Sequence, residues 1–196
     1  MPSLRSVISS LFLAAAALFA PVSASALSVI PPTFSQLVAE AETIARVEVT
    51  GQTSQWDVSP TGQKVIHTYV ACTVIKQLKG APQATLSLRF LGGQVGSEIM
   101  QIPDMPAFTT GEHCIVFVAA NGSAFCPLVR VMHGKYRLAA DAAGTERVSR
   151  NNGAALRSTD EVSASEETAG TLGVVGMKRD DFEAAVAAEV RHASVH

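Results

Sequence analysis

Residues 65–80, VIHTYVACTVIKQLKG, alternate apolar and polar side chains over most of their length. One face would carry Ile66, Val70, Cys72, Val74 and Leu78, and the other His67, Tyr69, Thr73, Gln77 and Lys79. A period of two is typical of a β-strand with one buried face. The pair Lys79-Gly80, with Pro82 close behind, should end it. We therefore predict a long central strand, with the neighbouring alternating segments beside it in a sheet.

The flanking segments complete a mainly β fold. Residues 43–57 and 84–91 alternate in the same way, and residues 136–140 and 145–150 are further candidate strands. Residues 112–119 and 124–132 surround Asn121-Gly122, which favours a hairpin. Thr33 and Gln36 form a capping-box pattern ahead of a short helix over residues 34–42. We predict a small OB-like or netrin-like antiparallel β-barrel with a short N-terminal helix and a C-terminal helix.

Composition divides the chain into four parts. Residues 1–26 combine Arg5, an apolar run over residues 7–20 and the small-residue motif Ala24-Ser25-Ala26, as signal peptides do. The mature chain should then begin at Leu27 and form the barrel over residues 27–150. Residues 151–176 are rich in Ser, Thr, Gly, Ala and acidic residues, which predicts a flexible linker. Residues 177–196 should contain the C-terminal helix, either docked or free.

Charge and hydropathy exclude two classes of partner. The formal net charge is −2, from 15 Lys and Arg against 17 Asp and Glu, so no basic footprint for nucleic acid is present. No later segment is long and apolar enough to span a bilayer, so we expect no membrane insertion after signal cleavage. The product is expected to be periplasmic or secreted.

Three cysteines in an exported chain favour one disulfide and one free thiol. Cys114 and Cys126 lie symmetrically about Ala120, so a hairpin centred there would place them opposite each other, and we predict that they pair. Cys72 faces the apolar side of the central strand and is expected to be a small buried hydrophobe. Pairing of Cys72 with either of the others is the alternative.

No arrangement of residues indicates catalysis or a cofactor. The sequence lacks a nucleophile elbow, a phosphate loop and a pair of carboxylates at useful spacing. The five histidines show no metal-ligand spacing, so no metal site is predicted. Met132-His133 together with Met100 and Met105 leaves one alternative, a soft copper site.

The remaining functional candidate is a binding surface. Residues 92–111 form a long loop that carries Gly93, Met100, Met105 and Phe108, and loops of this length are often functional. His67 and Tyr69 on the wetter face of the central strand are added to this surface. The alternative is that Met105 and Phe108 only cap the barrel.

The order of the segments ETIARVEVTG, HTYVACTVIKQLKG, ATLSLRFLGG and GEHCIVFVAANGSAFC resembles the netrin-like, or tissue-inhibitor-of-metalloproteinase-like, domain. It is also similar to a set of uncharacterised exported bacterial proteins of the same layout. The resemblance covers about residues 33–150 and implies an OB-type barrel. In the inhibitor family an N-terminal Cys chelates the protease zinc. Here the mature chain should start at Leu27, with no Cys before Cys72, so the resemblance implies only the barrel and a binding role.

The sequence thus favours an exported, non-enzymatic domain that binds an exported protein, such as a protease. A periplasmic His/Met copper-binding protein is the first alternative. An enzyme assembled from distant loops is the second, and it would require a deep polar pocket with several titratable groups.

Overall fold

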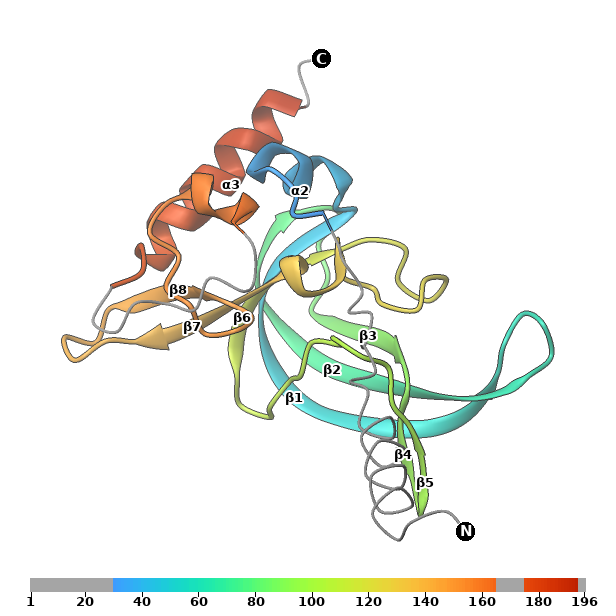
Figure 1. Cartoon of the computed structure of the whole chain (residues 1–196). Coiled ribbons are helices and arrows are strands. Elements are labelled where there is room, and N and C mark those ends of the chain that lie inside the picture. Colours follow the sequence, from blue (N-terminus) through green and yellow to red (C-terminus); the bar gives the residue numbers. More distant parts are fainter. Residues whose placement is uncertain (1–29, 165–174, 194–196) are drawn as a thin grey trace, which may run out of the picture.

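The computed structural model describes residues 30–164 and 175–193, and its fold is mainly β as predicted (Figure 1). The elements in chain order are α2 (Phe34–Glu40), β1 (Thr43–Val58), β2 (Lys64–Lys79), β3 (Thr85–Leu91), β4 (Gly93–Val95), β5 (Glu98–Met100), β6 (His113–Val118), η2 (Val131–Gly134), β7 (Lys135–Ala140), β8 (Glu146–Arg150), η3 (Thr159–Ser163) and α3 (Arg179–Ala193). None of the helices within these residues has the length and apolar character that a bilayer span requires.

Six strands form one antiparallel sheet in the order β3-β2-β1-β6-β7-β8, and β4 pairs with β5 in a small separate sheet. The two central strands, β1 and β2, are each 16 residues long and pair along their whole length, so their hairpin projects from the body of the molecule (Figure 1). Register shifts in β1, the last of them between Val49 and Gly51, mark bulges. Bulges bend a strand and increase its twist, which gives this sheet its curvature.

Residues 119–129 close the curved sheet. Asn121 accepts from the Arg89 N–H and donates to the Ser87 carbonyl, and the Leu91 N–H donates to the Phe125 carbonyl. At its other end the same segment bridges β6 through Val118 and Leu128. The segment therefore joins the outer edge of β3 to β6 and completes a ring around an apolar interior.

The sheet separates two apolar cores, because β1 and β6 bury side chains on both faces. We call the first the barrel core; its buried members are Ala45, Val47, Val49, Val70, Cys72, Leu86, Leu88, Phe90, Phe108, Cys114, Val116, Val118, Cys126, Leu128 and Val131. We call the second the helix core; its buried members are Leu37, Val38, Ala41, Ile44, Ile115, Phe117, Val129, Tyr136, Leu138, Val148, Leu156, Val162, Phe182 and Val186.

Helices α2 and α3 cover the helix core. The predicted capping box is present: the Thr33 hydroxyl accepts from the Gln36 N–H, and the Gln36 side chain accepts from the Thr33 N–H. At the other end of α2, Lys79 Nζ donates to the carbonyls of Val38 and Ala39. Lys79, predicted only to end the central strand, thus satisfies the free carbonyls of a helix C-terminus.

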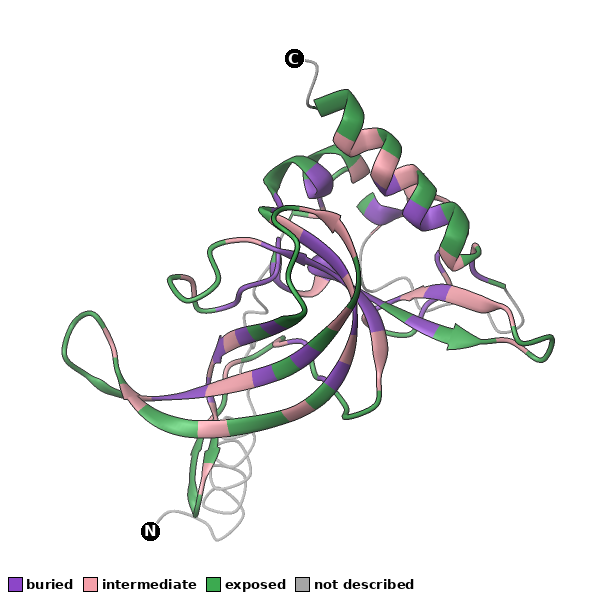
Figure 2. Ribbon diagram, turned by 180° about the vertical axis from the view of Figure 1, so that it is seen from behind, coloured by how far each residue is buried: buried purple, intermediate pink, exposed green. Residues whose placement is uncertain are grey.

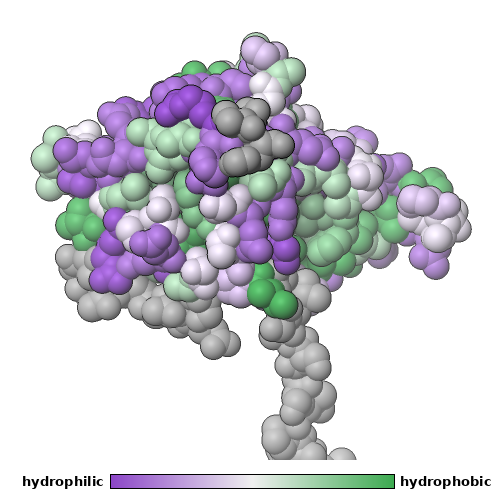
Figure 3. All heavy atoms as spheres, turned by 90° about the horizontal axis from the view of Figure 1, so that it is seen from above, coloured by the Kyte–Doolittle hydropathy of each residue, from purple (hydrophilic) through white to green (hydrophobic). Residues whose placement is uncertain are grey.

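The C-terminal helix α3 is docked and not free. Its buried residues lie on the side that faces the sheet (Figure 2). Phe182 packs against Phe34, Phe117 and Tyr136, with ring centroids 5.0 to 6.2 Å apart. Glu183 is buried beside it and meets Lys76 Nζ at 2.6 Å. Hydrophilic residues are spread over much of the outer surface that carries the two helices (Figure 3).

The prediction of a flexible linker is wrong for residues 151–164. Ala154, Leu156 and Val162 are buried, and the Leu156 N–H donates to the Val148 carbonyl of β8. These three apolar residues are widely spaced among polar ones, so the sequence pattern did not indicate that they would be buried. Their burial nevertheless holds the segment against the sheet. The expected signal peptide and residues 165–174 of the expected linker lie outside the described residues.

The predicted strand over residues 124–132 is also wrong. Arg130 and Val131 have φ values of 51° and 57°, in the left-handed region, so the backbone turns there and continues as η2. Of the predicted hairpin, the bridge between Val118 and Leu128 remains.

The predicted Cys114–Cys126 disulfide is not formed, and all three cysteines are free and buried. The register explains this. With Val118 opposite Leu128, antiparallel pairing places Cys126 near Ala120 and not opposite Cys114, which instead pairs with Arg137 of β7. Cys72 is as predicted a small buried hydrophobe.

Candidate functional site

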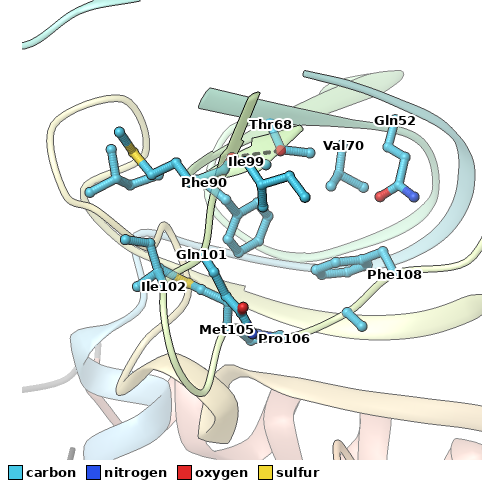
Figure 4. Close-up of a pocket in the computed structure, with 15 residues that line it drawn as sticks. Gln52, Thr68, Val70, Phe90, Ile99, Gln101, Ile102, Met105, Pro106 and Phe108 are labelled. Atoms are coloured by element: carbon cyan, nitrogen blue, oxygen red, sulfur yellow. Dashed lines mark hydrogen bonds between the residues drawn. The ribbon is translucent and has the colours of Figure 1, made fainter. Parts of the chain in front are cut away.

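An apolar cleft of about 350 Å³ opens at one end of the barrel (Figure 4). Its lining comes from the concave faces of β1, β2 and β3, from the β4–β5 hairpin and from the segment that leads back to β6. The lining residues are Gln52, Thr68, Val70, Phe90, Leu91, Gly92, Gly93, Ile99, Met100, Gln101, Ile102, Met105, Pro106, Ala107 and Phe108.

The floor of the cleft is aromatic and fixed. The rings of Phe90 and Phe108 are 5.5 Å apart at a tilt of 50°, and both side chains are buried. Phe90 is held by β3, and Phe108 lies where residues 101–112 return to the sheet. There the Gly111 N–H donates to the Val49 carbonyl, and the Val49 N–H donates to Glu112.

One wall is the β4–β5 hairpin, which lies against the concave face of β1 and β2. The Gly92 N–H donates to the Ile66 carbonyl, and the Thr68 hydroxyl donates to the Gly92 carbonyl at 2.7 Å (Figure 4). Gly93 has a φ of 137°, and a Cβ there would come within 2.5 Å of the Ser54 hydroxyl oxygen. The Gly-Gly pair therefore permits the hairpin backbone to lie directly on the side chains of Ser54 and Thr68, as well as a tight exit from β3.

A buried charge stands behind the floor. Lys135 is 2% exposed, and its Nζ lies 4.2 Å from the centre of the Phe108 ring, a cation–π contact. The same ammonium donates to the Ala107 carbonyl and lies 2.9 Å from Glu112 Oε1, which Arg137 Nε also approaches at 3.0 Å. These contacts hold Ala107 and Phe108 in place, so the cleft floor is preorganised.

The chemistry of the lining is that of a binding site. Its polar side chains are the neutral groups of Gln52, Thr68 and Gln101, and the Thr68 hydroxyl is already engaged. None of the residues that line this cleft has a titratable side chain. The cleft therefore offers apolar surface and a few hydrogen-bonding groups, and it supplies no acid, base or metal ligand of its own.

Four of the six predicted surface residues meet here. Gly93, Met100, Met105 and Phe108 all line the cleft. His67 and Tyr69 do not, since neighbouring positions of β2, Thr68 and Val70, point into the cleft and odd positions point to the other face.

The prediction that His67 lies on a wet face is wrong. The side chain is buried, and its Nδ1 lies 3.1 Å from Asp57 Oδ2 across the β1–β2 hairpin. This contact with an acidic neighbour across the hairpin gives the buried imidazole a polar partner. Tyr69 is half-buried on the same convex face.

Sequence reasoning missed several lining residues. Phe90 lies in the alternating segment 84–91, yet nothing in the sequence placed it beside Phe108. Ile99, Ile102 and Pro106 lie in the predicted loop. They could have been predicted as part of the binding surface, because each is an apolar residue in a segment without helical or long strand periodicity. Gln52 carried no signal at all.

The residues of the copper alternative are not brought together in the cleft. Met100 and Met105 line it, whereas Met132 and His133 belong to η2 and are absent from the lining. Burial, followed by the nearby Arg150 and Arg130 charges, lowers the pKa of His133. Within residues 30–164 and 175–193, no group of three or more His, Cys, Asp or Glu side chains could hold a metal ion.

No protein-family model matches this sequence, and no curated protein is significantly similar to it. The layout resemblance to netrin-like domains therefore stays an expectation.

Proposed function

We propose that this protein is an exported, non-enzymatic binding domain that receives an apolar side chain of an exported protein partner in the cleft. The observation that carries the proposal is a fixed aromatic floor beneath a rim of apolar residues, of which Ile99 is exposed and the others are half-buried. Ile99 on that rim is 68% exposed, and Met100 and Met105 beside it are half-buried.

The size of the cleft supports a protein anchor. A volume of about 350 Å³ is near the lower end of the range, about 300 to 1,000 Å³, that small-molecule sites occupy. One or two large apolar side chains fill such a space, and anchors of this kind supply most of the energy of protein interfaces. The side-chain amides of Gln52 and Gln101 could orient the backbone that carries the anchor.

The first test is capture of a partner from the exported fraction, with the chain from Leu27 as bait and Ile99→Ser as the cleft variant. Ile75→Ser is the matched control, because Ile75 is also an exposed isoleucine, at 43%, and does not line the cleft. We expect a stoichiometric partner whose affinity falls roughly tenfold or more in Ile99→Ser, as for an interface anchor, and is unchanged in Ile75→Ser.

Two results would contradict the proposal. One is a partner that both variants bind as well as the wild type, since the cleft would then lie outside the interface. The other is turnover of a substrate by the purified protein, with the cleft variant inactive.

A further inference from the structure

The distal half of β1 has a free edge. Strand β6 pairs with β1 over residues 43–48, and its hydrogen bonds end at Val49. From Gly51 to Val58 the strand pairs with β2 on one side only. The β4–β5 hairpin lies on the concave face here, over the side chains of Ser54 and Thr68, and does not occupy the edge.

The register shows which backbone groups face outward. On β2, Val74 and Ile66 bond toward the β3 side, so the even positions face β3 and the odd positions face β1. The odd positions Tyr69 and His67 lie opposite Thr53 and Gln55 of β1, so the backbone groups of Thr53 and Gln55 are bonded to β2. The backbone groups of Gln52, Ser54 and Trp56 point away from the sheet, and in the described chain no other segment bonds to them.

Other edges of the sheet are covered by the chain itself. The edge of β3 is bonded by Asn121 and Phe125. The edge of β8 is bonded by the segments around Leu156 and Met177, and Lys178 bridges Arg147. No such cover is bonded to the distal edge of β1 by the described residues, although this edge spans eight positions.

This edge also lacks the usual protection. Monomeric proteins guard a free edge with Lys, Pro, a bulge or a very short strand, because unpaired backbone groups recruit other strands. Residues 51–58, GQTSQWDV, contain neither Lys nor Pro, and the last register shift in β1 precedes them. Two large apolar side chains are exposed along it, Trp56 at 37% and Val58 at 65%.

We propose that the distal edge of β1 pairs with the same edge of a second copy of this chain. The pairing is antiparallel about a two-fold axis at Gln55 and joins two curved sheets into one. A two-fold axis makes the interface isologous, with the same residues contributed by each copy. The edge shares Gln52 with the cleft lining and contains no residue of the cleft floor, so the inference does not depend on the proposed function.

The segment is self-complementary in this register. Gln55 faces Gln55 of the second copy, Ser54 faces Trp56, and Gln52 faces Val58, so both exposed apolar side chains gain a cross-strand neighbour. Asp57, the one charged residue of the segment, faces Thr53 and not its own copy. Like charges therefore do not oppose each other, and the outward groups of Ser54 and Trp56 form hydrogen-bonded pairs.

The test is sedimentation velocity over micromolar to near-millimolar concentrations, with intrinsic fluorescence recorded on the same samples. Trp56 is the only tryptophan, so its emission reports on this edge directly. We expect a concentration-dependent doubling of mass with a parallel blue shift. Gln55→Lys and Gln55→Glu should each remain monomeric, because like charges then face each other across the axis. An equimolar mixture of the two should recover the dimer.

Gln63→Lys is the matched control, since it adds the same charge in the turn outside the paired segment and should dimerise like the wild type. Far-ultraviolet circular dichroism would show that each variant is folded. A wild-type protein that stays monomeric throughout would overturn the proposal. So would a dimer that Gln55→Lys leaves intact, or one that forms without a change in Trp56 emission.

Discussion

The two faces of β1 are covered to different extents by the rest of the chain. On the helix-core face, Ile44 is covered by α2 and α3, which close over an aromatic cluster centred on Phe182. On the opposite face, Val47 and Val49 belong to a barrel core whose end is left open at the cleft, over Phe90 and Phe108. Both sides are apolar, so composition alone does not tell them apart.

The difference lies in what covers each side. The helix core is covered by elements whose polar residues face solvent, whereas the rim of the cleft carries the exposed Ile99 beside the half-buried Met100 and Met105. The chain covers one apolar face completely and leaves the other partly open at the cleft. An open apolar surface over a preorganised floor is where a partner is expected to bind. Stability should depend mainly on the closed side, and binding on the open one.

The largest expected effect separates the two sides directly. Phe182→Ala should lower the free energy of unfolding by about 3 to 5 kcal/mol, because a fully buried ring is lost from an aromatic cluster. Ile99→Ala on the cleft rim should change it by less than about 0.5 kcal/mol. Urea denaturation measures both changes in unfolding free energy. Similar losses at Phe182 and Ile99 would contradict the distinction between a stabilising helix core and a binding cleft.

The buried ion pairs sharpen the same comparison, because each side has one. Glu183→Gln leaves Arg46 and Lys76 without their shared carboxylate, and Lys135→Met leaves Glu112 with Arg137 alone. Each should cost about 2 to 4 kcal/mol of unfolding free energy. Lys135 also fixes Phe108, so binding of an apolar fluorescent dye to the folded protein should change in Lys135→Met and not in Glu183→Gln. Equal dye binding in both variants would show that the floor does not depend on Lys135.

The smallest effect per residue concerns the thiols, which all lie on the barrel side. Burial raises the pKa of Cys72 and Cys126 to about 11, and that of Cys114 to about 12, from the ordinary value of 9.0. Because the unfolded thiols ionise first, their stabilisation is fully present below pH 9 and is lost as the pH rises toward 11. Between pH 9 and 10 we expect a loss of about 1 kcal/mol per thiol.

Thiol counting gives an independent check on the same residues. A thiol reagent at neutral pH should label none of the three in the folded protein and all three after unfolding without reductant. If only one thiol is labelled after unfolding, the other two are joined in a disulfide, which would contradict the register argument.

Much of the fold could be predicted from the period-two patterns of β1, β2, β3 and β7, although Ile44 of β1 is buried on the face opposite to Ala45, Val47 and Val49. Prediction failed where structure depended on contacts distant in sequence. Arg130 and Val131 adopt left-handed backbone in a segment that alternates like a strand. Leu156 and Val162 looked like linker residues because the core that holds them comes from β8 and α3. For the cleft, the loop identified Met105 and Phe108, but Phe90 and Lys135 reach it only through the fold.

The bond from Lys79 to the end of α2 also bears on the order in which the chain can acquire structure. A helix of seven residues is too short to persist alone, so α2 should gain stability only once Lys79 is in place at the end of β2. Helix α2, β1 and β2 are consecutive and lie within residues 34–80. A chain that emerges N-terminus first could therefore assemble this αββ unit as a template while β6 to α3 are still to come.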